Sequence, residues 1–94
     1  MKKASLEMLR RQVEQTDRKL ITLLNERANL SVAIGEAKRE EGKAVYDPCR
    51  EAKVYRLLAD LALGPLSEAS LRAIFREVIS ASLSLPLRSI SSTT

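Results

Sequence analysis

The chain has 94 residues, a formal charge of +4, a single cysteine (Cys49) and no histidine. This size allows one domain, and this composition excludes a zinc site, an imidazole base, a Ser-His-Asp triad and an intrachain disulfide. Only three residues are aromatic, and three Gly and three Pro are too few for the turns of a β-sandwich or barrel. We therefore expect an aliphatic, helical core.

The first predicted element is a long amphipathic helix from about Ser5 to about Glu41. Ser5 is a suitable N-cap, and Gly42 is a suitable stop. Apolar residues recur at steps of three and four along this segment, which predicts one buried stripe: Leu6, Leu9, Val13, Leu20, Leu23, Leu24, Leu30, Ile34 and Ala37.

Two shorter helices are predicted to follow a loop at 42–47. Asp47-Pro48 opens the second helix as N-cap and first helical residue, and Gly64-Pro65 ends it. Ser67 caps the third helix. The expected apolar faces are Ala52, Tyr55, Leu58, Leu61 and Ala62 in the second helix, and Leu71, Ile74, Phe75, Val78, Ile79 and Leu83 in the third.

The length of the first helix predicts an intertwined homodimer. About 36 residues give a rod of roughly 54 Å. A compact chain of this size has a radius of gyration of about 12 Å, which corresponds to a diameter of only roughly 30–35 Å. The two shorter helices are too short to cover the stripe, so a second chain is expected to do so. We expect an all-α domain over residues 1–86 and a disordered tail over 87–94.

Several charged residues lie where they could form an anion site. Arg27 and Lys38 are three helical turns apart and point the same way, beside the apolar stripe. Arg10 lies about 25 Å from Arg27 along the rod, so only an antiparallel partner helix could bring it to the same pocket. Arg50 and Glu51 fall in the first turn of the second helix, whose free N–H groups suit carboxylate ligands. A purely structural role also fits, with Arg27 and Lys38 as snorkelling side chains or as ion-pair partners of Glu26, Glu36 or Glu41.

Taken together, these residues resemble the all-α class of chorismate mutases, including the mutase domain of bifunctional chorismate mutase/prephenate dehydratases. The resemblance covers about residues 5–85. It is carried by LRRQVEQTDRKLITLLNER (9–27), IGEAK (34–38), VYDPCRE (45–51) and FREVISAS (75–82).

The resemblance implies an intertwined dimer that rearranges the dicarboxylate chorismate to prephenate without metal or cofactor. Arg27 and the partner's Arg10 would clamp the two carboxylates, and Lys38 would donate to the ether oxygen and a carboxylate. Arg50 would support the carboxylate site. Glu51 and the Asp47 backbone would hold the substrate hydroxyl, Ile34 would form an apolar wall, and Ser82 would place a hydroxyl near a carboxylate. The expected catalytic residues are Lys38, Arg27 and Glu51.

One position departs from the family pattern. The family usually places a Gln or Glu one turn after the serine at 82, as a second donor to the ether oxygen, and here that position is Pro86. Proline has no side-chain donor and tends to end a helix. Four explanations remain open. Ser84 or a water replaces the missing donor, the third helix is shifted in register, the chain is a weak catalyst, or the tail is a truncated junction to a fused pathway enzyme.

Three other functions compete with a mutase. An isochorismate-pyruvate lyase would share the fold and much of the pocket, and an inactive mutase-like domain would only dimerise or serve a partner enzyme. A small basic module that binds nucleic acid is disfavoured, because no helix has a one-sided Lys/Arg stripe. We expect no membrane span, since no apolar run approaches the roughly 18–20 residues needed, and a cytoplasmic location, since one unpaired cysteine fits a reducing compartment.

Overall fold

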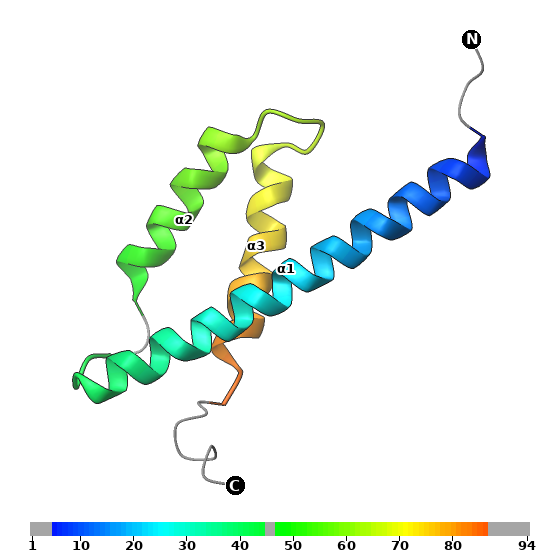
Figure 1. Cartoon of the computed structure of the whole chain (residues 1–94). Helices are drawn as coiled ribbons and strands as arrows, with labels where there is room; N and C mark the ends of the chain where they lie inside the picture. Colours follow the sequence, from blue (N-terminus) through cyan, green and yellow to red (C-terminus); the bar gives the residue numbers. More distant parts are fainter. Residues whose placement is uncertain (1–4, 45–46, 87–94) are drawn as a thin grey trace, which may run out of the picture.

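The computed structural model describes residues 5–44 and 47–86, which fold into three α-helices (Figure 1). These are α1 (Leu6–Glu40), α2 (Pro48–Leu61) and α3 (Glu68–Leu83). The described residues contain no strand, so the predicted all-α class with one long and two shorter helices is confirmed. The predicted tail at 87–94 and the pair Val45–Tyr46 of the quoted segment lie outside the described residues.

The three predicted N-caps are confirmed. Each cap side chain accepts a hydrogen bond from a backbone N–H of the first turn: Ser5 from Met8 at 3.1 Å, Asp47 from Arg50 at 3.2 Å and Ser67 from Ser70 at 3.1 Å. These bonds satisfy donors that a helix start leaves without an intrahelical partner.

The predicted end of α2 at Gly64-Pro65 is wrong by three residues. The helix ends at Leu61, because Ala62 turns to φ −78° and ψ 63° and the Leu63 N–H donates to the Leu61 carbonyl at 2.8 Å. This is an inverse γ-turn, a tighter turn than a helix allows. The residue before a proline also disfavours helical backbone, so the chain leaves the helix before it reaches Pro65.

Helix α3 packs against both other helices and supplies the centre of the core. The buried apolar side chains are Val32 of α1, Leu58 of α2 and Ile79 of α3, each at most 9% exposed. The predicted stripe of α1 omitted Val32, and its own members at Leu6, Leu9, Val13, Leu20, Leu23 and Leu30 are between 46% and 65% exposed in the single chain. Helix α3 contacts the side of α1 that carries Val32 and Gly35, so the stripe that we expect a second chain to cover stays exposed in the single chain.

The protomer is elongated rather than compact. Its extents are 61 × 35 × 16 Å and its Cα radius of gyration is 17.5 Å, against about 12 Å for a compact chain of this length. In Figure 1 the N-terminal half of α1 projects past α2 and α3. Among the described residues, none of the helices combines the length and hydrophobicity that crossing a bilayer requires.

Candidate active site

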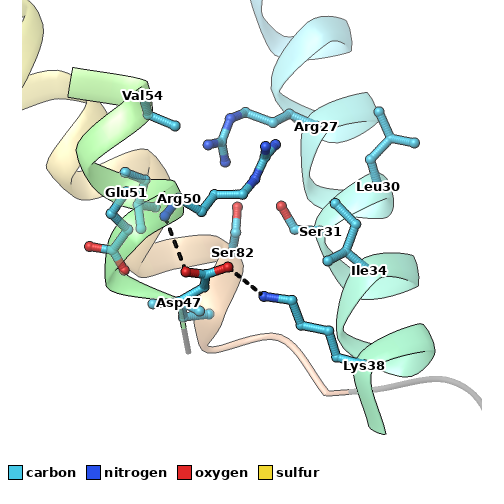
Figure 2. Close-up of a pocket in the computed structure, with 12 residues that line it drawn as sticks. Arg27, Leu30, Ser31, Ile34, Lys38, Asp47, Arg50, Glu51, Val54 and Ser82 are labelled. Carbon is cyan, nitrogen blue, oxygen red and sulfur yellow. Dashed lines mark hydrogen bonds and ion pairs between the residues drawn. The ribbon is translucent and has the colours of Figure 1, made fainter. Parts of the chain in front are cut away.

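A cavity of about 260 Å³ lies where the C-terminal half of α1 meets the start of α2 and the end of α3 (Figure 2). Three cations, two carboxylates, two serines and several aliphatic side chains surround it. The lining residues are Arg27, Leu30, Ser31, Ile34, Lys38, Asp47, Arg50, Glu51, Val54, Ile79, Ser82 and Leu83.

Five residues of α1 line this cavity, and helix periodicity explains why four of them follow one another along it. Arg27, Ser31, Ile34 and Lys38 follow one another at steps of four, three and four residues, so they lie on one face of the helix. The guanidinium carbon of Arg27 lies 5.9 Å from the centre of the Phe75 ring, within the range of a cation–π contact. Phe75 on α3 therefore helps to orient Arg27 beside the cavity.

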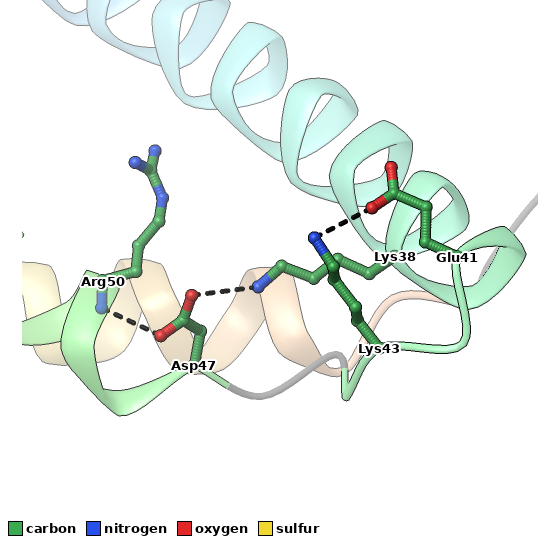
Figure 3. Close-up of polar contacts among 5 residues, drawn as sticks. All are labelled: Lys38, Glu41, Lys43, Asp47 and Arg50. Atoms are coloured by element: carbon green, nitrogen blue, oxygen red, sulfur yellow. Dashed lines mark hydrogen bonds and ion pairs between the residues drawn. The ribbon is translucent and has the colours of Figure 1, made fainter.

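Lys38 and Asp47 form an ion pair at the edge of the cavity (Figure 3). The Lys38 Nζ lies 3.2 Å from the Asp47 Oδ2, and the two side chains are 20% and 41% exposed. Asp47 lies nine residues further along the chain, at the start of α2, and not on α1 with the acids first considered as partners of Lys38. One of those acids, Glu41, pairs with Lys43 at 3.0 Å.

Asp47 carries out two structural tasks with one carboxylate. Its Oδ1 accepts from the backbone N–H of Arg50 while its Oδ2 accepts from Lys38. The backbone hydrogen bond, followed by the hydrogen bond from Lys38, holds the pKa of Asp47 below its ordinary value. The carboxylate therefore stays ionised in neutral solution, and it links the end of α1 to the start of α2.

The first turn of α2 brings a second guanidinium to the cavity. Arg50 extends from α2 toward the same space as Arg27, and Glu51 and Val54 line the α2 wall (Figure 2). Two guanidiniums and one ammonium around a small cavity favour a bound anion, because such groups form charge-assisted hydrogen bonds with carboxylates. The aliphatic walls reduce competition from water.

Helix α3 closes the cavity with Ile79, Ser82 and Leu83. The half-buried Ser82 hydroxyl lines the cavity and donates to the Val78 carbonyl at 3.0 Å, and a hydroxyl can rotate to donate to another acceptor. Ser84 does not line the cavity, and its hydroxyl already donates to the Ala81 carbonyl at 2.8 Å. It is therefore a poor replacement for the side-chain donor that Pro86 lacks.

Seven of the eight predicted site residues line this cavity, and Arg10 does not. Arg10 is exposed on the projecting half of α1, 17 residues and about 25 Å along the axis from Arg27. The single chain therefore brings together every predicted site residue except the one that we assigned to a second chain.

Five lining residues were not predicted as site residues: Leu30, Ser31, Val54, Ile79 and Leu83. Leu30, Ile79 and Leu83 were expected in the apolar faces, and they serve as walls. Ser31 had a usable signal, since it lies one turn after Arg27 on the helical face that carries Lys38. Val54 lies one turn after Arg50 and could have been found in the same way. The described residues include no cluster of three His, Cys, Asp or Glu residues suited to a metal ion.

Comparisons with known proteins agree on one family. The family described as chorismate mutase type II matches residues 9–86. A bifunctional chorismate mutase/prephenate dehydratase from Neisseria gonorrhoeae is 43% identical over 76 residues, and one from Aquifex aeolicus is 37% identical over 84 residues. The structure of chorismate mutase (form II) from Thermus thermophilus superposes with a TM-score of 0.82 at 35% identity.

The extent of these matches differs between the two kinds of relative. The alignments cover 81% and 85% of this chain but only 20% and 23% of the two bifunctional proteins. The match to the Thermus thermophilus structure covers 85% of this chain and 91% of that chain. The chain thus spans about a fifth of the length of the bifunctional relatives, and nearly all of the solved mutase.

Proposed function

The chain belongs to the chorismate mutase type II family, and from this premise we propose that it converts chorismate into prephenate. The reaction is an intramolecular Claisen-type rearrangement: the ether C–O bond breaks, a C–C bond forms, and no proton or electron is exchanged with the protein. It needs a site that binds a dicarboxylate and stabilises charge on the ether oxygen.

One observation carries this proposal: Arg27, Lys38 and Arg50 converge on one cavity of about 260 Å³ with aliphatic walls. If these side chains had only a structural role, they would be expected to extend into water, where surface ion pairs contribute little to the stability of the fold. Lys38 is instead only 20% exposed. A half-buried ammonium beside two guanidiniums is suited to a dianion, and the Asp47 carboxylate limits their mutual repulsion until the substrate arrives.

We assign the roles by the chemistry of each side chain. Arg27 binds one carboxylate, and Lys38 donates to the ether oxygen and to a carboxylate. Arg50 supports the carboxylate site, while Glu51 and the Asp47 backbone bind the substrate hydroxyl. Ile34 forms an apolar wall, and the Ser82 hydroxyl turns its hydrogen from the Val78 carbonyl to a carboxylate of the substrate.

We also propose that the active protein is a homodimer in which Arg10 of the partner subunit completes each pocket. The apolar face of α1 that lines the cavity at Ile34 continues past Leu20 to Val13 and Leu9, and no element of the described residues 5–44 and 47–86 covers it. These side chains are between 40% and 59% exposed. A second α1 packed on this face in antiparallel orientation would cover them and carry Arg10 toward the pocket.

The test is a continuous assay of chorismate consumption by the purified chain, with the product identified by chromatography. Formation of prephenate is the expected result. Pyruvate and salicylate formed from isochorismate, without prephenate from chorismate, would indicate the lyase. Absence of turnover on both substrates would indicate a mutase-like domain without activity of its own.

The family membership also suggests which class of enzyme consumes the product. The bifunctional relatives join a mutase to a prephenate dehydratase, so we propose that the product here is consumed by an enzyme of that class, fused or separate. We propose a cytoplasmic location, which the exposed free thiol of Cys49 supports, since such thiols persist in reducing compartments.

A further inference from the structure

Ser31 is the pocket hydroxyl that makes no hydrogen bond within the described part of the chain. Helical hydroxyls commonly donate to the carbonyl four residues earlier. Thr16, Thr22 and Ser82 do so here, at 2.9, 3.0 and 3.0 Å. Ser31 lines the cavity and is half-buried. Its donor is therefore available to a ligand.

The position of Ser31 places this donor between two of the cations. It follows Arg27 by one turn, about 6 Å along the axis, and precedes Lys38 by two turns, about 10 Å. Figure 2 shows its side chain pointing from α1 into the cavity between the side chains of these two residues. The neighbouring walls of α1 are Leu30 and Ile34, so few other neutral donors on this helix compete for a ligand atom there.

We propose that the Ser31 hydroxyl donates a hydrogen bond to the ether oxygen of the bound substrate. This inference rests on the proposed mutase function. The carboxylates of the dianion are drawn to guanidinium and ammonium groups, with which they form the stronger, charge-assisted bonds. The ether oxygen connects the two carboxylate-bearing parts of the molecule, so it falls in the middle of the stretch between Arg27 and Lys38. It gains negative charge as the C–O bond breaks, and a fixed neutral donor then stabilises it more than in the ground state.

The first test is the steady-state kinetics of Ser31→Ala. We expect kcat to fall about 5- to 10-fold with KM changed less than about twofold, because the lost bond strengthens in the transition state. Alanine has the higher helix propensity, so α1 should remain folded, which circular dichroism verifies. Ser80→Ala is the matched control, since Ser80 is an exposed serine of α3 outside the cavity, and it should retain wild-type kcat and KM.

The second test measures binding without turnover. Calorimetry compares a bicyclic dicarboxylate transition-state analogue that contains the ether oxygen with a carbocyclic analogue in which CH₂ replaces it. Ser31→Ala should weaken binding of the first about 5- to 10-fold and leave the second unchanged. Equal weakening of both analogues, an increase in KM alone, or a kcat within twofold of wild type would each overturn the assignment. A wild-type protein that forms no prephenate contradicts the proposed function itself, whereas active wild type with active Ser31→Ala contradicts only the role of Ser31.

Discussion

The two halves of α1 have the same helical pattern but very different surroundings. The C-terminal half packs on α3 through the buried Val32 and Gly35 and carries five residues of the cavity. The N-terminal half projects into solvent, with Leu9 46% and Val13 59% exposed. The C-terminal half is covered by α3 on the side that carries Val32 and Gly35, whereas the apolar stripe stays open along both halves, with Leu30 65% exposed. The unequal coverage indicates which part of the site one chain can build.

The largest effect is expected from Lys38 in the packed half. Lys38→Ala should lower kcat about 1,000-fold, because it removes a preorganised charged donor from the position where charge develops. It also leaves the Asp47 carboxylate in the cavity without its ammonium partner. Steady-state assay of prephenate formation measures the loss. Lys43→Ala is the control, since Lys43 is exposed and outside the cavity, and a Lys38→Ala enzyme within a few-fold of wild type would contradict the assigned mechanism.

The second-largest effect tests whether the projecting half reaches a second pocket. Arg10→Ala should lower kcat/KM about 100-fold, the loss expected when one side of a desolvated charge pair is removed. In the single chain, Arg10 is exposed and far from the cavity, so an effect of this size requires a partner chain. Arg11→Ala is the control, because Arg11 is also exposed and pairs with Glu7 on its own helix.

A mixing experiment makes this test decisive. Arg10→Ala and Lys38→Ala chains, unfolded together and refolded, form mixed dimers in which one pocket receives both native residues. Random pairing should recover about a quarter of wild-type activity. If the mixture is no more active than the separate variants, the two residues do not share a pocket.

Sequence alone predicted the fold well because its signals are local. Ser5, Asp47 and Ser67 each cap a helix with their own side chain, and capping depends on only three or four neighbouring residues. The end of α2 was missed because the γ-turn at Ala62 has no strong residue preference. Val32 was missed because its burial depends on which side of α1 meets α3, and that is a long-range choice.

The candidate site was predictable where helical spacing controls it. Arg27 and Lys38 share a face by periodicity alone, and Ser31 could have been found by the same rule. The Lys38–Asp47 ion pair could not, since it joins two helices across the 41–47 connection. Its formation depends on the direction in which α2 leaves that connection.

A charge on the apolar face of the projecting half should separate a dimer from a monomer. Val13→Asp should lower the apparent free energy of unfolding by about 2 kcal/mol or more, because a dimer interface would bury the carboxylate without a partner. On a free surface the change should stay within about 0.5 kcal/mol. Denaturant unfolding at several protein concentrations measures this, since dimer stability rises with concentration. Gln15→Asp, on the opposite face of α1, is the control and should be nearly neutral.

The smallest effect is expected from the ion pair between Lys38, in the C-terminal half of α1, and Asp47 at the start of α2. Asp47→Asn keeps a good N-cap but removes the charge paired with Lys38. Because the folded pKa of Asp47 is lowered, its stabilising contribution is fully present above its unfolded pKa of about 3.9. That contribution is lost as the pH falls through the folded pKa.

Wild type should therefore exceed Asp47→Asn in stability at neutral pH, and the difference should vanish in acid below the folded pKa. Urea unfolding across this pH range measures it, with Asp60→Asn, an exposed aspartate of the same helix, as the control. A difference that persists unchanged into acid would mean that apolar packing on α3, rather than the ion pair, positions α2 against α1. In that case Asp47→Asn would lower turnover without changing how α2 is positioned, because the variant lacks the carboxylate that holds the Lys38 ammonium in wild type.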